Sequence, residues 1–120
     1  MRILRFVDDS GKILYGKELD AGSAEVIHTS PLAESPRSTG QTAKIASRLA
    51  PIEPVNIFCI GKNYLEHARE GGDDTAPERP IMFMKSTAAL NHPDGPIRLP
   101  ACSPQPETDY ECELAVVIGK

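Results

Sequence analysis

The chain has 120 residues, a length that allows one small domain and excludes two large ones. Its 13 lysine and arginine residues are scattered and are outnumbered by 17 aspartate and glutamate residues, giving a net charge of −4, so neither nucleic acid nor an anionic membrane is expected as a partner. No apolar run approaches the roughly 20 residues that span a bilayer, and the N-terminus is too polar for a secretory signal. We therefore expect a cytoplasmic protein, with a mitochondrial location as the alternative if a targeting segment precedes this sequence.

The three cysteines, Cys59, Cys102 and Cys112, are an odd number and show no C-x-x-C spacing. Neither a disulfide framework nor a zinc site is indicated. We expect reduced cysteines that serve as small apolar residues.

The first 50 residues are predicted to hold a β-hairpin, an irregular region and one short helix. The segment "MRILRFVDDSGKILYGKEL" indicates two strands joined by a turn at Asp8–Gly11, where aspartate and glycine supply turn geometry. Residues 21–36 contain glycine and prolines among small polar residues, so a loop or an irregular strand is expected. A helix is predicted over residues 41–49, because Ile45 and Leu49 are four apart and two prolines follow.

The second half of the chain alternates short strands with turns. "NIFCIG" and "IMFMKS" indicate strands, and "YLEHAREGG" indicates a short helix that ends at two glycines. A proline-rich connector leads to a final predicted strand, "DYECELAVVIGK". With 11 prolines and 9 glycines, long helices are excluded, so the predicted fold class is mostly β (α+β) with short helices.

The final predicted strand begins with carboxylates on one face. Asp109, Glu111 and Glu113 alternate with Tyr110 and Cys112, and side chains two apart on a strand stand roughly 7 Å apart on the same face. Two such carboxylates can approach one hard cation, and Mg²⁺ suits them better than zinc does. The alternative is a solvated sheet face, or carboxylates paired with arginine and lysine.

His67 and Glu70 are three apart in the predicted short helix and so lie on one face of it. A carboxylate beside an imidazole fixes its tautomer and raises its basicity, as a general base acting on water requires. The helix follows a strand-to-glycine turn, where active-site groups are often presented, and Lys62 and Asn63 add polar donors. The alternative is a histidine and a glutamate that lie together on the surface.

Lys85 ends the otherwise apolar strand "IMFMK". It could hold a substrate carboxylate or carbonyl oxygen. Alternatively, it is a strand-end lysine whose ammonium reaches water.

Three segments in this order resemble a known family. "IFCIGKNYLEHARE", "RPIMFMKSTAAL" and, after a connector with "IRLP", "DYECELAVVIGK" resemble the N-terminal half of the catalytic domain of the fumarylacetoacetate hydrolase (FAH) superfamily. The resemblance covers about residues 51–120, whereas residues 1–50 resemble the variable N-terminal region of many members. It implies a mixed β-sandwich roll, incomplete in this chain, that binds Mg²⁺ or alternatively Mn²⁺ or Ca²⁺.

The resemblance also implies roles for individual residues. Glu111 and Glu113 match the E-x-E metal ligands, His67 and Glu70 match the His–Glu dyad that activates water, and Lys85 matches the lysine of an F-x-K-P segment in which Ser86 here replaces the proline. The family's third metal carboxylate, an aspartate, would fall beyond residue 120, so the chain is expected to be truncated.

The activity implied is that of a metal-dependent hydrolase or lyase of small oxo acids or 1,3-dicarbonyl compounds. Hydrolysis of a carbon–carbon bond, as in fumarylacetoacetate or acylpyruvates, and decarboxylation of oxaloacetate both use a metal-stabilised enolate. Isomerisation and hydration occur in other members, and the full-length family member is expected to be a homodimer. The alternative is a truncated, catalytically inactive FAH-like binding module or fragment.

Overall fold

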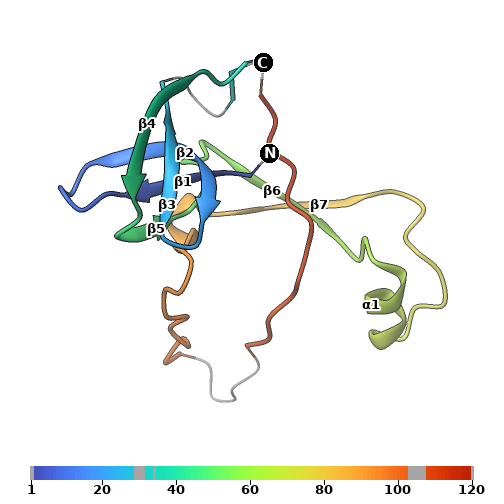
Figure 1. The fold of residues 1–120 in the computed structure, drawn as a ribbon. Helices are drawn as coiled ribbons and strands as arrows, with labels where there is room; N and C mark the ends of the chain where they lie inside the picture. The colour runs from blue at the N-terminus through green and yellow to red at the C-terminus, as the bar shows by residue number, and fades with distance from the viewer. Residues whose placement is uncertain (1, 29–31, 34, 103–107, 120) are drawn as a thin grey trace. The chain divides into compact units, whose positions relative to one another are not determined.

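The computed structural model describes residues 2–28, 32–33, 35–102 and 108–119 (Figure 1). The chain divides into two compact units. The sheet unit comprises Met1–Ile52 with Asn91–Lys120, and the hairpin unit comprises Glu53–Leu90. Along the described residues strands outweigh helix, and both sheets are antiparallel, which confirms the predicted mostly β class. None of the helices in the described ranges is long and apolar enough to cross a membrane.

The sheet unit is built on a five-stranded antiparallel sheet in the order β4-β3-β2-β1-β5. Its strands are β1 (Ile3–Val7), β2 (Ile13–Asp20), β3 (Ser23–Ile27), β4 (Ser38–Lys44) and β5 (Ser47–Leu49). The predicted hairpin is confirmed by β1 and β2, which pair from Ile3 opposite Lys17 to Val7 opposite Ile13. Residues 21–36, for which a loop or an irregular strand was predicted, contain β3, a strand whose pairing with β4 shifts register between Glu25 and Ile27.

Turn chemistry explains the first hairpin. The carboxylate of Asp8 accepts hydrogen bonds from the hydroxyl of Ser10 at 2.6 Å and from the backbone N–H groups of Ser10 and Lys12 at 2.9 Å. Gly11 has a φ of 84°, a conformation that glycine adopts without steric cost. The hydroxyl of Ser10, followed by the Lys12 N–H, holds the pKa of Asp8 below its ordinary value, because these hydrogen bonds favour the charged carboxylate.

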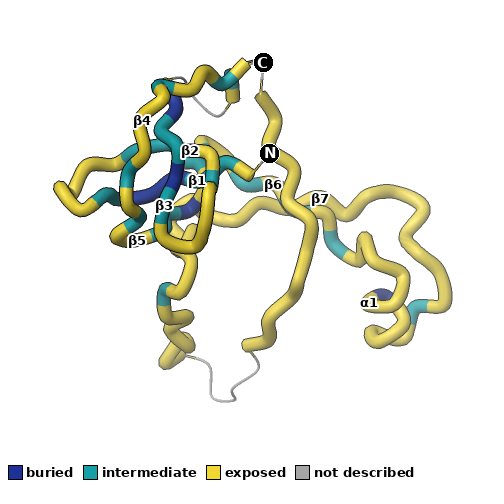
Figure 2. Tube along the Cα trace, in the orientation of Figure 1, coloured by how far each residue is buried: buried dark blue, intermediate teal, exposed yellow. Residues whose placement is uncertain are grey.

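The sheet unit packs around a small apolar core (Figure 2). Phe6 and Ala24 are fully buried, and Ile27 and Ala50 are nearly so. Gly16 lies against this core: a Cβ there would stand 2.9 Å from the Cβ of Ala24 and 3.1 Å from Cε1 of Phe6. The absence of a side chain at Gly16 therefore lets β2 approach its neighbours.

The helix predicted over residues 41–49 is not formed. β4 covers residues up to Lys44 and pairs with β3, and β5 begins at Ser47 and pairs with β1. Between them, the backbone N–H of Ile45 donates to Gly22 O and that of Ala46 donates to Val7 O, both at 2.9 Å. Ile45 and Leu49, four residues apart, are only a weak indication of a helix. The backbone N–H and C=O groups of this segment form hydrogen bonds with β3 and β1 in place of hydrogen bonds within a helix.

The hairpin unit contains a two-stranded antiparallel sheet, a helix and a 3₁₀ turn. These are β6 (Ile57–Gly61), α1 (Leu65–Glu70), β7 (Ile81–Lys85) and η1 (Thr87–Ala89), which agree with the strands and the helix predicted here. Pairing runs from Ile57 opposite Lys85 to Gly61 opposite Ile81. The hydroxyl of Ser86 accepts the N–H of Ala88 at 3.2 Å, so this serine caps η1.

The predicted final strand is also not formed. The described residues 108–119 belong to no helix or strand, and every one of them is exposed, as the tube in Figure 2 shows. The carboxylates of residues 109–113 do alternate with Tyr110 and Cys112, as in a strand. A strand, however, also requires a neighbouring strand for its backbone hydrogen bonds.

Candidate functional site

The candidate dyad lies on α1, whose ends are shaped by the residues around it. The preceding strand, β6, ends at Gly61, and the helix begins after Tyr64, whose side chain makes no capping hydrogen bond. At the other end, the N–H of Gly72 donates to Arg69 O at 2.9 Å and the N–H of Asp73 donates to Ala68 O at 3.0 Å. With a φ of 88° at Gly72, this is a Schellman motif, which fits the predicted glycine stop.

His67 and Glu70 come together as the helical spacing predicted. Nδ1 of His67 lies 3.6 Å from Oε2 of Glu70, the separation of an ion pair when the imidazole is protonated and longer than a hydrogen bond. The side chains are 51% and 78% exposed. The pair is therefore open to water.

Lys85 occupies the last position of β7, opposite Ile57. Ile81, at the first position of the strand, is opposite Gly61, which leads into α1. Four residues at about 3.3 Å each separate the Cα atoms of Ile81 and Lys85 by about 13 Å. Lys85 therefore lies at the end of the hairpin remote from the turn into α1, and its role in substrate binding stays a prediction.

Glu111 and Glu113 belong to the sheet unit, whereas His67, Glu70 and Lys85 belong to the hairpin unit. Both glutamates are exposed. Within the described ranges, no three histidine, cysteine, aspartate or glutamate side chains gather into a group that could hold a metal ion. Carboxylate oxygens are the donors that Mg²⁺ prefers, so the residue types fit this ion, but the assignment of the two glutamates as its ligands stays a prediction.

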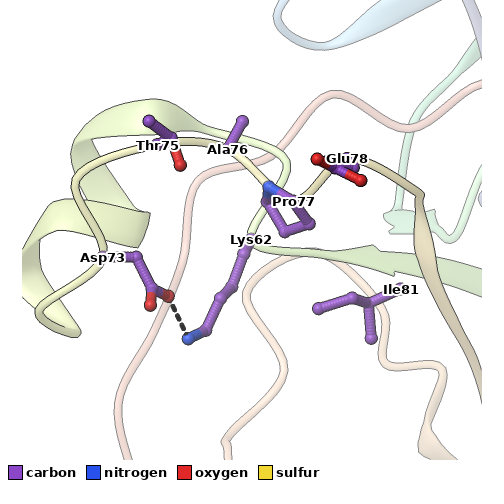
Figure 3. Close-up of a pocket in the computed structure, with 7 residues that line it drawn as sticks. All are labelled: Lys62, Asp73, Thr75, Ala76, Pro77, Glu78 and Ile81. Carbon is purple, nitrogen blue, oxygen red and sulfur yellow. Dashed lines mark hydrogen bonds and ion pairs between the residues drawn. The ribbon is translucent and has the colours of Figure 1, made fainter.

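A second polar feature of the hairpin unit was not assigned from the sequence. Figure 3 shows Lys62 and Asp73 pointing toward one another, and Nζ of Lys62 forms an ion pair with Oδ2 of Asp73. They line a cavity of about 380 Å³ together with Thr75, Ala76, Pro77, Glu78 and Ile81. In the sequence, Lys62 directly follows Gly61 at the end of β6, and Asp73 directly follows the two glycines that end α1. No helix or strand periodicity brings together two residues that are eleven positions apart, so the sequence did not predict this ion pair.

Comparison with known proteins identifies the family. The family model described as "Fumarylacetoacetate (FAA) hydrolase C-terminal" matches residues 56–120, more than half of the chain. The chain belongs to the fumarylacetoacetate hydrolase family. The resemblance read from the three ordered segments is confirmed, and α1 with its His67–Glu70 pair lies within the matched residues.

The chain is similar to proteins from distant organisms. The whole chain is 35% identical to Protein Rv2993c of Mycobacterium tuberculosis and spans 46% of that protein's length. A stretch of 71 residues, 59% of the chain, is 51% identical to the Fumarylacetoacetate hydrolase domain-containing protein 2 homolog of Dictyostelium discoideum and spans 22% of it. A stretch of 75 residues, 62% of the chain, is 47% identical to a protein of Xenopus laevis named "Oxaloacetate tautomerase fahd2, mitochondrial" and spans 23% of it.

The chain thus spans less than half of the length of each of these relatives. The comparison with solved structures gives no significant match.

Proposed function

We propose that this chain supplies the proton-transfer dyad and two metal-binding carboxylates of a metal-dependent enzyme that acts on small oxo acids. The observation that carries the proposal is the approach of His67 Nδ1 to Glu70 Oε2 on α1, inside the region that the FAH family model matches. An exposed imidazole beside a carboxylate can accept a proton from water or from a carbon acid, and the carboxylate stabilises the imidazolium that results.

The proposed residue roles follow from their chemistry. Glu70 orients the ring of His67, and Nε2 of His67 takes the proton. Glu111 and Glu113 are the proposed ligands of Mg²⁺, with Mn²⁺ or Ca²⁺ as alternatives, and Lys85 is the proposed partner of a substrate carboxylate or carbonyl oxygen. When bound, the cation supplies Lewis-acid stabilisation of the negative charge on an enolate oxygen.

Three reactions of a 1,3-dicarbonyl or 2-oxo acid share that enolate. If His67 activates water, the hydroxide attacks a carbonyl carbon and the carbon–carbon bond beside it is hydrolysed. If carbon dioxide leaves from the carboxylate attached to the carbon beside the carbonyl group, as in oxaloacetate, the electrons of the broken bond form the enolate, and this decarboxylation needs no water nucleophile. If His67 removes a proton from the carbon between the two carbonyl groups and the enolate oxygen is protonated, the reaction is tautomerisation.

Tautomerisation of oxaloacetate is the second candidate function. It is supported by two similar proteins with this activity in their names, one from Xenopus laevis at 47% identity and one from Bos taurus at 45% identity. The two matches involve 62% and 60% of this chain.

The deciding experiment incubates the purified chain and Mg²⁺ with oxaloacetate and, separately, with an acylpyruvate. Carbon dioxide release measures decarboxylation, loss of the enol absorbance without carbon dioxide measures tautomerisation, and formation of two acids measures hydrolysis. His67→Gln should lower kcat by about 10²–10⁴-fold, the usual contribution of a general base. His28→Gln, which removes an exposed histidine of the sheet unit, is the matched control and should leave kcat unchanged.

Full activity in His67→Gln would refute the assigned role of the dyad. A folded wild-type chain that turns over neither substrate would favour the alternative of a non-catalytic FAH-like binding module.

A further inference from the structure

The ion pair between Lys62 and Asp73 joins the two ends of the α1 segment. Lys62 directly follows β6, and Asp73 directly follows the glycines that end α1, so the pair encloses residues 63–72, including His67 and Glu70. The two side chains are 42% and 45% exposed, and Figure 3 shows their contact among the residues that line the cavity.

Lys62 adopts an unusual backbone conformation. Its φ is 53°, in the left-handed region that a lysine rarely adopts. Such a conformation persists where the surrounding structure holds it in place, and it is concentrated at functional sites. The left-handed turn redirects the chain as β6 gives way to α1, and the ammonium group of the same residue is held by Asp73. The backbone of Lys62 thus directs the chain into α1, and its side chain joins the start of this segment to Asp73 at its end.

α1 needs support from outside itself. It has six residues, fewer than an isolated helix requires in water, and its first turn has no side-chain cap from Tyr64. Asp73 supports the other end twice, because its N–H closes the Schellman motif on Ala68 O and its carboxylate holds Lys62. Exposed ion pairs usually contribute little to stability, but in a helix so close to the limit of stability a small contribution changes the folded population measurably.

We propose that Lys62 and Asp73 are positioning residues: their ion pair holds α1, and with it the His67–Glu70 pair, in the folded orientation. The catalytic consequence of this inference rests on the proposed function of the dyad. The structural part does not, because it concerns the population of α1 in the chain itself.

The test breaks the ion pair from each side and then rebuilds it with the charges exchanged. Asp73→Asn and Lys62→Asn each remove one charge, and asparagine tolerates the left-handed conformation at position 62. Lys62→Asp/Asp73→Lys restores an ion pair of similar total reach, and aspartate also tolerates that conformation. Asp74→Asn, which neutralises the neighbouring carboxylate of the same loop, is the matched control.

The first readout is the ¹³Cα secondary shift of residues 65–70 together with the ring resonances of His67, measured by NMR. Each single variant should lower the ratio of helical to non-helical α1 by about two- to fivefold, the effect of an exposed ion pair. The charge-exchanged variant should return the shifts toward the wild-type values, and Asp74→Asn should leave them unchanged. Unchanged shifts in Asp73→Asn, or no recovery in the charge-exchanged variant, would overturn the proposal.

The second readout is the oxo-acid assay, which separates this inference from the proposed function. In an active chain, Asp73→Asn should lower kcat and leave KM unchanged, and the exchanged pair should restore kcat. If α1 melts in Asp73→Asn while kcat stays the same, the positioning role is wrong. If the wild-type chain has no turnover, the proposed function fails, and the NMR shifts alone decide whether the ion pair holds α1.

Discussion

A methyl group added at Gly16 tests the packing of the five-stranded sheet. The Cβ of an alanine there would lie 2.9 Å from both the Cβ of Ala24 and the carbonyl oxygen of Glu25, and 3.1 Å from Cε1 of the buried Phe6. Two of these atoms are fixed by the backbone of β3, so no flexible side chain can simply turn away. The sheet itself must shift to relieve the overlap.

The expected cost follows from two opposing effects. Overpacking of this kind destabilises a protein by about 1–3 kcal/mol, and the smaller conformational entropy of unfolded alanine offsets about 0.4–1 kcal/mol of it. Taking the middle of each range, Gly16→Ala should lower the free energy of unfolding by about 1.3 kcal/mol, equivalent to a fall in Tm of about 5–10 °C. Urea denaturation followed by circular dichroism measures this change.

Gly22→Ala is the matched control for this prediction. Its added Cβ would lie 3.7 Å from the nearest neighbouring atom, Oδ1 of Asp20, which is ordinary van der Waals contact. This variant should be neutral or slightly stabilising. If Gly16→Ala proves as stable as Gly22→Ala, the close approach of β2 to β3 and Phe6 described above is wrong.

Three further predictions concern charges. Arg48→Met should lower the free energy of unfolding by about 0.5–1.5 kcal/mol in urea denaturation, because it removes the 2.7 Å hydrogen bond from Arg48 to Glu18, whose carboxylate keeps its ion pair with Arg2 at 3.2 Å; no loss would refute this. Because the folded pKa of Asp8 is depressed, its contribution is present above pH about 4 and is lost as pH falls through the folded pKa. The stability difference between the wild type and Asp8→Asn should therefore shrink on acidification, and a difference that grows would contradict the turn geometry. Titration calorimetry should detect Mg²⁺ binding that Glu111→Gln/Glu113→Gln abolishes, whereas equal binding by this variant would remove both glutamates from the proposed metal site.

Sequence patterns succeeded where the decisive interactions are local. The hairpin of β1 and β2 was predictable because Asp8 makes its hydrogen bonds to residues two and four positions away. The approach of His67 to Glu70 was predictable for the same reason, since three residues of helix place both side chains on one face. In both cases the interacting residues are at most four positions apart in the sequence.

The patterns failed where the partner is distant in sequence. The helix predicted over residues 41–49 overlaps the end of β4 and the whole of β5, and it was wrong because these strands pair with β3 and β1, a pairing that no local pattern predicts. Polar and apolar side chains alternate over residues 109–113 as in a strand, but no strand forms over residues 108–119. Such alternation defines two faces, whereas a strand also needs a neighbouring strand to accept and donate its backbone hydrogen bonds. The ion pair of Lys62 with Asp73 was missed because it depends on how the glycines turn the chain after α1.

The same distinction applies to the proposed chemistry. The residues of the proposed dyad are three apart on α1, and the proposed metal ligands are two apart within the sheet unit, so each pair is local in sequence. The hairpin that carries the dyad is a two-stranded sheet, which is marginally stable by itself, and Phe58, Ile60, Met82 and Met84 are exposed on one of its faces. With so little burial to hold α1, its orientation depends on contacts at its own ends. The Lys62–Asp73 pair is therefore the contact at which removing a single charge should lower the folded population of α1 and, with it, the activity of the proposed dyad.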